Sequence, residues 1–207
     1  MLKLYMTPGS CSTGIHILLE ELDLVFEAQI VNLLAGDQHK PEFLAINPKA
    51  TIPVLVKDDG SAITEFQAIA YWLARTYPKA GLLATGPDQA AQAIELMDYV
   101  VATIHGQGFQ RLFVPEKFGT DSAQYDQVKR QGTAIVNQAL ALVARALPEQ
   151  GYAVGGFGIA DAALFYVEFW ADRSDIELPV RCRQHYQLML TRPAVRRVLM
   201  EEGYRPG

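Results

Sequence analysis

The sequence predicts an α/β domain followed by an all-helical domain. Three observations carry this expectation. Strand and helix patterns are mixed over roughly the first 80 residues, every apolar pattern beyond residue 88 has helical spacing, and residues 80–87 between them read as a linker. We therefore expect a first domain over 1–79, a linker over 80–87 and a helical domain over 88–207.

The first domain opens with a predicted β-α-β unit. Residues 2–6 alternate apolar and polar side chains, which is the period of a strand. The apolar residues that follow have helical spacing: Ile15, Leu18, Leu19 and Leu22. Phe26, Ala28 and Ile30 alternate again. Two strands joined through a helix favour parallel pairing.

The rest of the first domain reads as β-β-α. A short helix is expected over 40–46, and a strand over 52–56 starts at a proline. Asp58-Asp59-Gly60 is a strong hairpin signal, so 61–64 is the return strand and 65–76 a helix. The order β-α-β-β-β-α is that of a thioredoxin-like domain.

The second domain reads as a series of helices. Long helices are expected from Asp88 to about Phe113 and over 121–147. Residues 159–170 are almost continuously apolar, which predicts a central buried helix. Two shorter helices, split by Pro193, are expected to follow.

The composition excludes several classes of partner. The net charge of −5 and the lack of a Lys/Arg cluster argue against nucleic acid. No apolar run is long enough for a membrane span, and the opening residues show no secretory signal. Two cysteines make a poor disulfide framework, so a reducing compartment, the cytoplasm, is expected. Four scattered histidines suggest no metal site.

Cys11 is the first candidate for chemistry, because it lies where the first strand gives way to the first helix. Unpaired amides and the helix dipole stabilise a thiolate there, so we expect a lowered pKa. Ser10, Ser12 and Thr13 lie beside it and have hydroxyls that can donate to a ligand thiolate. The alternatives are that Cys11 is an inert buried residue and that the hydroxyls cap the helix.

Three segments of this domain resemble the cytosolic glutathione transferases, and the first resembles the bacterial beta class. They are Leu4-Tyr5-Met6-Thr7-Pro8-Gly9-Ser10-Cys11-Ser12, Asn47-Pro48-Lys49-Ala50-Thr51-Ile52-Pro53-Val54-Leu55 and Thr64-Glu65-Phe66-Gln67-Ala68-Ile69. The resemblance implies a thioredoxin-like domain, a helical domain, glutathione as co-substrate and a homodimer. It also implies that the bond before Pro53 is cis.

The resemblance places the parts of glutathione on particular residues. The backbone of Ile52, set by Pro53, would pair with the cysteinyl part, and Glu65 with the amides after it would hold the γ-glutamyl end. Relatives have Ser where Phe66 stands, so a hydroxyl donor is lost and a ring is added. Glutathione binding is expected to be altered, unless Phe66 simply packs into the core.

Further candidates come from loops and from the helical domain. Gly36-Asp37-Gln38-His39-Lys40 resembles the segment with which theta-like relatives contact the glycyl carboxylate. This resemblance implies His39 and Lys40 as donors, with Lys49 as another candidate, and the alternative is that all three are solvated. His105 resembles the beta-class histidine that faces the ligand thiol, although a core role is an alternative. Asp98, seven residues earlier and so two turns back on an α-helix, would reach glutathione in the neighbouring subunit.

Gly158 and Asp161 resemble the segment that caps the family's central helix, which is a folding role.

Three functions remain open. The leading hypothesis is an enzyme that conjugates the glutathione thiolate to a small hydrophobic electrophile. The second is a thiol–disulfide oxidoreductase in which Cys11 forms a mixed disulfide with glutathione, since no second cysteine stands near it. The third is a binding protein of the same family without turnover, for which Phe66 is the favouring feature.

Overall fold

The computed structural model describes residues 1–205. The chain divides into two compact units, one formed by residues 1–83 together with 189–207 and the other by residues 84–188. The C-terminal residues therefore belong with the α/β part, although they follow the helical part in sequence. The domain boundaries expected from the sequence stay a prediction.

The first unit contains a four-stranded mixed sheet of order β2-β1-β3-β4. Strand β1 (Leu2–Met6) pairs in parallel with β2 (Phe26–Ile30), as the β-α-β pattern predicts. Strand β3 (Val54–Val56) is antiparallel to both β1 and β4 (Ala62–Thr64). The expected thioredoxin-like order is confirmed.

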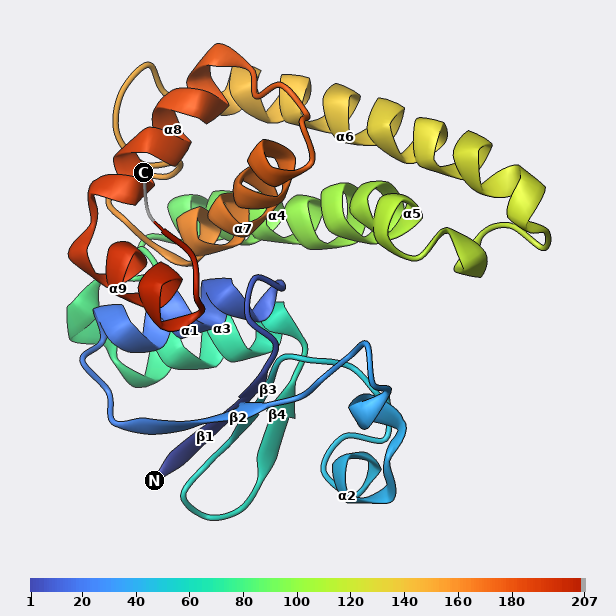
Figure 1. Cartoon of the computed structure of the whole chain (residues 1–207). Helices are drawn as coiled ribbons and strands as arrows, with labels where there is room; N and C mark the ends of the chain where they lie inside the picture. The colour runs from blue at the N-terminus through green and yellow to red at the C-terminus, as the bar shows by residue number, and fades with distance from the viewer. Residues whose placement is uncertain (206–207) are drawn as a thin grey trace. The chain divides into compact units, whose positions relative to one another are not determined.

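Helices α1 (Ser12–Glu21) and α3 (Phe66–Thr76) lie along one face of this sheet (Figure 1). Helix α9 (Pro193–Glu201), from the end of the chain, packs beside α1. Because the sheet, α3 and α9 surround α1, every residue from Ser12 to Leu19 is buried. This helix therefore has no solvent-exposed face over its first two turns.

Three elements of the first unit differ from their expected bounds. Strand β3 begins at Val54, not at position 52, because Pro53 has no amide hydrogen to donate to a ladder. The helix expected over 40–46 is a short 3₁₀ turn, η1 (Asp37–His39), followed by α2 (Pro41–Leu44). A further 3₁₀ turn, η2 (Pro78–Ala80), lies where the linker was expected to begin.

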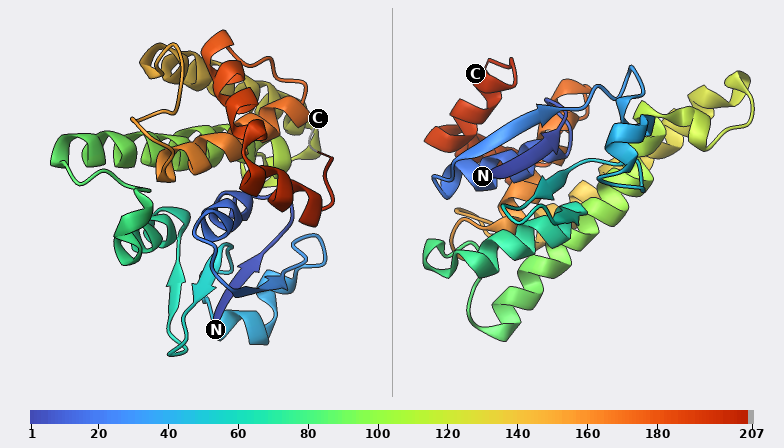
Figure 2. Two further views of the ribbon diagram at one scale, coloured as in Figure 1. Left: turned by 90° about the vertical axis from the view of Figure 1, so that its left-hand side faces the viewer. Right: turned by 90° about the horizontal axis from the view of Figure 1, so that it is seen from below.

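The second unit is helical throughout its regular elements. Three long helices shape it, α4 (Pro87–Tyr99), α6 (Tyr125–Ala146) and α7 (Ile159–Arg173), and α6 runs beside the segment that continues α4 (Figure 2). Residues 159–171 of α7 are all buried, which confirms the expected central helix. Its shorter elements are α5 (Gln110–Phe113), η4 (Pro115–Lys117) and η5 (Ser122–Gln124), and α8 (Val180–Thr191) begins within it.

The single helix expected over 88–113 is interrupted. Residues Val100–Phe109 form a π-helical segment, η3, between α4 and α5. Gly108 lies there against α6, and a Cβ on it would meet Val136 Cγ2 at 2.6 Å. The glycines near His105 thus mark a change of helix type, in which each hydrogen bond spans five residues instead of four. Among residues 1–205, no helix has the length and hydropathy needed to cross a membrane.

Candidate functional site

Cys11 lies at the junction of the β1–α1 loop and α1, and its side chain is buried. Its thiol donates a long hydrogen bond to the Ile52 carbonyl, with Sγ and O 3.7 Å apart. Burial raises the pKa of the thiol to about 12, although the amides of Cys11 and Ser12 favour the thiolate, and the charge of Glu65 raises it further. The expected lowering of this pKa is wrong because desolvation outweighs the helix start.

The two serines beside Cys11 bond to the loop itself. Ser12 is fully buried, and its hydroxyl donates to the Thr7 carbonyl at 3.1 Å and accepts from the Thr7 amide at 3.2 Å. Ser10 Oγ accepts from the Ser12 amide at 3.1 Å and lies 2.6 Å from Ser12 Oγ. The hydroxyl of Ser12 is therefore committed to closing the loop, which corrects the expectation that it is available to a ligand thiolate.

The C-terminal segment holds the same loop in place. Glu202 Oε2 accepts from the Gly9 amide and from the Thr13 hydroxyl, each at 2.7 Å. Its other oxygen, Oε1, lies 2.9 Å from His16 Nδ1. Sequence reasoning missed Glu202 because 193 positions separate it from Gly9 and no local pattern connects them.

The residues expected to hold the cysteinyl part of glutathione lie just before β3. The Ile52–Pro53 bond is cis, as the resemblance implied. Ile52 stands outside the strand ladder, and within the described residues its amide has no hydrogen-bond acceptor. Its carbonyl faces the Cys11 thiol. Cys11 and Ile52, 41 positions apart, thus come together through the fold.

Glu65 is the residue before α3, and its backbone has a positive φ of 76°. Such a conformation is strained for a residue with a Cβ, and strain of this kind is frequent at functional sites. The carboxylate is exposed and accepts from Lys49 Nζ at 2.7 Å, while Lys49 also donates to Thr64 at 2.8 Å. Lys49, expected to bind a glycyl carboxylate, therefore has a protein partner here.

Phe66 and the η1 loop complete the candidates of the first unit. The Phe66 side chain is buried, so its ring packs into the core. This is the alternative that the sequence left open to altered glutathione binding. His39 and Lys40 are exposed, and Lys40 Nζ pairs with Asp37 at 2.6 Å. The roles of His39 and Lys40 stay predictions.

The remaining two candidates belong to the second unit. His105 lies in η3, where its ring packs edge-on against Trp170 at a centroid distance of 4.9 Å and its Nδ1 is 3.4 Å from Tyr166 Oη. Burial lowers its pKa to about 4, so the ring is neutral at pH 7. Asp98 is exposed on α4. The expectation that Asp98 lies two turns before His105 assumed a regular α-helix. It is wrong because the π-helical segment η3 begins at Val100, between them.

The capping segment of α7 is part of a buried charge network. Asp161 accepts from the Gly158 amide at 2.8 Å and the Ala153 amide at 2.7 Å, which confirms a folding role. His185 bridges Asp161 at 3.0 Å and Glu168 at 2.7 Å. Sequence reasoning missed His185 and Glu168, since no motif marks them.

Comparisons with known proteins show the family of the chain. A model of the glutathione S-transferase N-terminal domain matches residues 9–76. The chain is 32% identical to glutathione S-transferase GstA of Escherichia coli O157:H7, over 98% of this chain and 99% of that protein. The chain belongs to the glutathione S-transferase family. The expected enzyme class, a glutathione transferase, is thereby confirmed.

Two further glutathione S-transferase relatives are informative. A crystal structure of a glutathione transferase homolog from Sulfitobacter, with bound glutathione, has a TM-score of 0.90 and 30% identity, covering 97% of this chain and 98% of that one. Maleylacetoacetate isomerase of Pseudomonas aeruginosa is 29% identical over 93% of this chain and 91% of that protein. The family thus includes more than one reaction.

Proposed function

We propose that this glutathione S-transferase joins the thiolate of glutathione to a small hydrophobic electrophile. The observation that carries the proposal is the meeting of Cys11, at the start of α1, with the Ile52 carbonyl just before β3. An extended tripeptide paired with the Ile52 backbone would bring its own sulfur to the start of α1. Its γ-glutamyl end would then lie toward Glu65 and the first amides of α3.

The chemistry of Cys11 supports a donor role and opposes a nucleophilic one. With a pKa of about 12, the thiol stays protonated at neutral pH, so its S–H can be redirected from Ile52 to a ligand thiolate. The same pKa leaves very little Cys11 thiolate for mixed-disulfide formation. This argues against the oxidoreductase alternative.

The bound glutathione thiolate would be the nucleophile. It attacks the electrophilic carbon, a carbon–sulfur bond forms, and the leaving group departs with its electron pair. Cys11 and the amides at the start of α1 favour the thiolate over the thiol, which lowers the pKa of glutathione. The protein's contribution is to ionise and orient the ligand.

Glu65 would bind the α-ammonium group of the γ-glutamyl residue. Its carboxylate is exposed and already accepts one ammonium group, that of Lys49. The Phe66 side chain beside it is buried in the core and offers no hydroxyl to the ligand. The absent hydroxyl still removes one hydrogen bond to a charged group, a loss of about 1.5–3 kcal/mol in affinity.

Turnover of a generic aryl halide with glutathione, measured from pH 6 to 8, tests this function. We expect Cys11→Ala to lower kcat/KM about fivefold to tenfold, the effect of one lost hydrogen bond of about 1–1.4 kcal/mol. The apparent pKa of the bound glutathione should also rise. Cys182→Ala removes the other buried thiol, in the second unit, and should change neither quantity. Equal profiles for wild type and Cys11→Ala would contradict the assigned role.

Calorimetry with glutathione separates catalysis from mere binding. Glu65→Gln keeps the side-chain shape and removes the charge, so we expect glutathione to bind at least about tenfold more weakly. A measurable heat of glutathione binding without turnover of any electrophile would favour the non-catalytic alternative. Absence of both heat and turnover would refute the proposal as a whole.

The proposal extends to a cytoplasmic homodimer. Support comes from the family resemblance and from the exposure of Asp98 on α4, since a residue that reaches another protomer must be accessible. Sedimentation velocity should then give twice the monomer mass, and a monomer at micromolar concentration would refute this part.

A further inference from the structure

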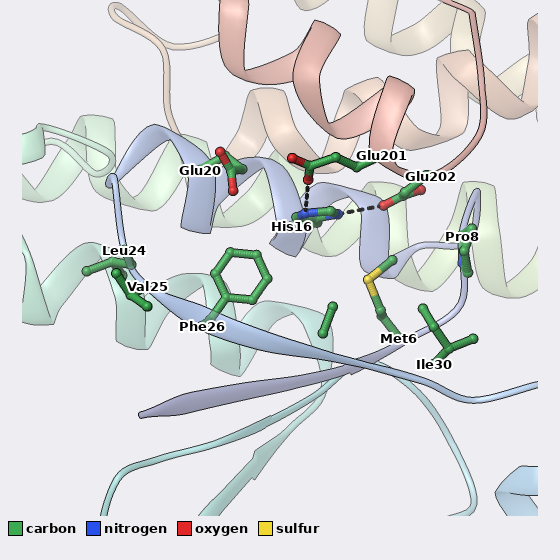
Figure 3. Close-up of a pocket in the computed structure, with 11 residues that line it drawn as sticks. Met6, Pro8, His16, Glu20, Leu24, Val25, Phe26, Ile30, Glu201 and Glu202 are labelled. Atoms are coloured by element: carbon green, nitrogen blue, oxygen red, sulfur yellow. Dashed lines mark hydrogen bonds and ion pairs between the residues drawn. The ribbon is translucent and has the colours of Figure 1, made fainter.

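A hollow of about 350 Å³ lies in the first unit beside α1, β2 and α9, and the glutathione proposal does not use it (Figure 3). Apolar side chains such as Phe26 and Leu24 form part of its wall. Glu202 and three side chains that are grouped as candidate ligands, His16, Glu20 and Glu201, also line it. One potential ligand atom from each of these three lies within 4.8 Å of the others.

The orientation of His16 is set by a buried carboxylate. The ring is buried on α1, and its Nδ1 lies 2.9 Å from Glu202 Oε1. The other oxygen of Glu202 accepts from the Gly9 amide and the Thr13 hydroxyl. A carboxylate against one ring nitrogen, with the other nitrogen directed at the ion, is the usual arrangement of a metal-binding histidine.

The other ring nitrogen of His16 faces a second carboxylate. His16 Nε2 lies 3.3 Å from Glu201 Oε2. Bonds of about 2.0–2.1 Å to a tetrahedral Zn²⁺ place neighbouring ligand atoms about 3.3–3.4 Å apart, which matches this separation.

Glu20 supplies the third ligand atom. It is one turn after His16 on the same face of α1. Arg197 donates to its Oε2 at 2.7 Å, which leaves Oε1 for an ion. A divalent ion held by Glu20 and Glu201 would be neutralised by their two charges, an important condition in a partly buried hollow. The Phe26 ring packs edge-on against His16 and holds the imidazole in place.

We propose that His16, Glu20 and Glu201 bind one divalent transition-metal ion, Zn²⁺ by their donor set, with Glu202 orienting the imidazole. One nitrogen and two carboxylate oxygens leave a fourth position for water. The ion would join α9 to α1. Through Glu202 it would also secure the loop that carries Gly9.

Calorimetric titration of ZnCl₂ into the EDTA-treated and dialysed full chain, without glutathione, tests the site. We expect one equivalent of Zn²⁺ to bind and to raise the Tm, and Co²⁺ to give the visible absorption of a tetrahedral site. Glu20→Gln and Glu201→Gln should each weaken binding at least tenfold. Glu177→Gln is the matched control, because it removes an exposed carboxylate paired with Arg183 and should change nothing.

Glu202→Gln tests the orienting role. It keeps the side-chain shape, and we expect it to weaken Zn²⁺ binding about 10–100-fold while the Co²⁺ band remains.

Several results would overturn the proposal. Absence of Zn²⁺ binding would mean that His16 and the carboxylates only hydrogen-bond to one another. Unchanged Zn²⁺ affinity in Glu20→Gln and Glu201→Gln would show that the ion binds elsewhere. Loss of Zn²⁺ binding in Cys11→Ser would show the same. None of these measurements depends on transferase activity, so their failure leaves the proposed function standing.

Discussion

At the scale of single residues, the conformation of Gly9 matters most for the β1–α1 loop. Its φ is +72°, and a Cβ there would overlap the Tyr204 ring, with Cζ at 2.7 Å. Its amide is also bonded to Glu202. A side chain at this position would therefore have to move the C-terminal segment and strain the backbone at once.

We expect Gly9→Ala to lower the free energy of unfolding by about 2–5 kcal/mol. About 1–2 kcal/mol would come from the left-handed backbone and about 1–3 kcal/mol from the overlap with Tyr204. Gly36→Ala is the control, because Gly36 has φ +75° but nothing within 4 Å, so only the backbone cost applies. Urea denaturation measures the free energy of unfolding of both variants. Equal losses in Gly9→Ala and Gly36→Ala would show that Tyr204 moves away at no cost.

At the scale of elements, the crossing of η3 and α6 depends on two glycines. A Cβ on Gly132 of α6 would overlap the Leu112 side chain and would lie 2.8 Å from both Arg111 Cβ and the Gly108 carbonyl. A Cβ on Gly108 would lie 2.6 Å from Val136 Cγ2. The backbones approach because neither residue carries a side chain.

Gly132→Ala should therefore destabilise the protein, although helix propensity alone predicts about 1 kcal/mol of stabilisation. We expect a loss of about 1–3 kcal/mol, the cost of overpacking. Ala134→Gly, at an exposed position of the same helix, should cost only the ordinary 1 kcal/mol or so. A stabilised Gly132→Ala in thermal or urea unfolding would show that η3 can move away from α6.

At the scale of the whole molecule, the buried network on α7 makes stability depend on pH. Burial opposes the charge of His185, but the attraction of Glu168 and hydrogen bonds to Glu168 and Asp161 outweigh it and raise the His185 pKa to about 10. Burial raises the pKa of Glu168 to about 7, partly opposed by His185. Both pKa values are raised. At a pH between its unfolded and its folded pKa, each group therefore keeps its proton in the folded chain and releases it in the unfolded chain.

The free energy of unfolding should consequently fall as pH rises from about 6.5 toward 10. The stabilisation that the charged His185 contributes is fully present below the pKa of histidine in the unfolded chain. It is lost as the pH approaches the pKa of His185 in the folded chain, with a slope of at most about 1.4 kcal/mol per pH unit for one proton. Glu168→Gln removes the main attraction and should flatten the slope between pH 7 and 9. The same slope in urea denaturation of both proteins would assign the effect to other groups.

Local patterns in the chain were sufficient to predict most of the fold. Alternation in β1, the helical spacing of α1, the Asp58-Asp59-Gly60 hairpin and the apolar run of α7 each determine their element, because periodicity is a property of neighbouring residues. The family resemblance added the cis bond before Pro53.

The tertiary structure alone decided the electrostatics of the site. Cys11 has the position of a low-pKa thiol but is buried, so desolvation reverses the expected shift. The sequence suggested no metal site, because Glu201 and Glu202 join His16 and Glu20 only through folding. Burial and long-range contacts depend on which distant segments pack together, and a local pattern does not contain that information.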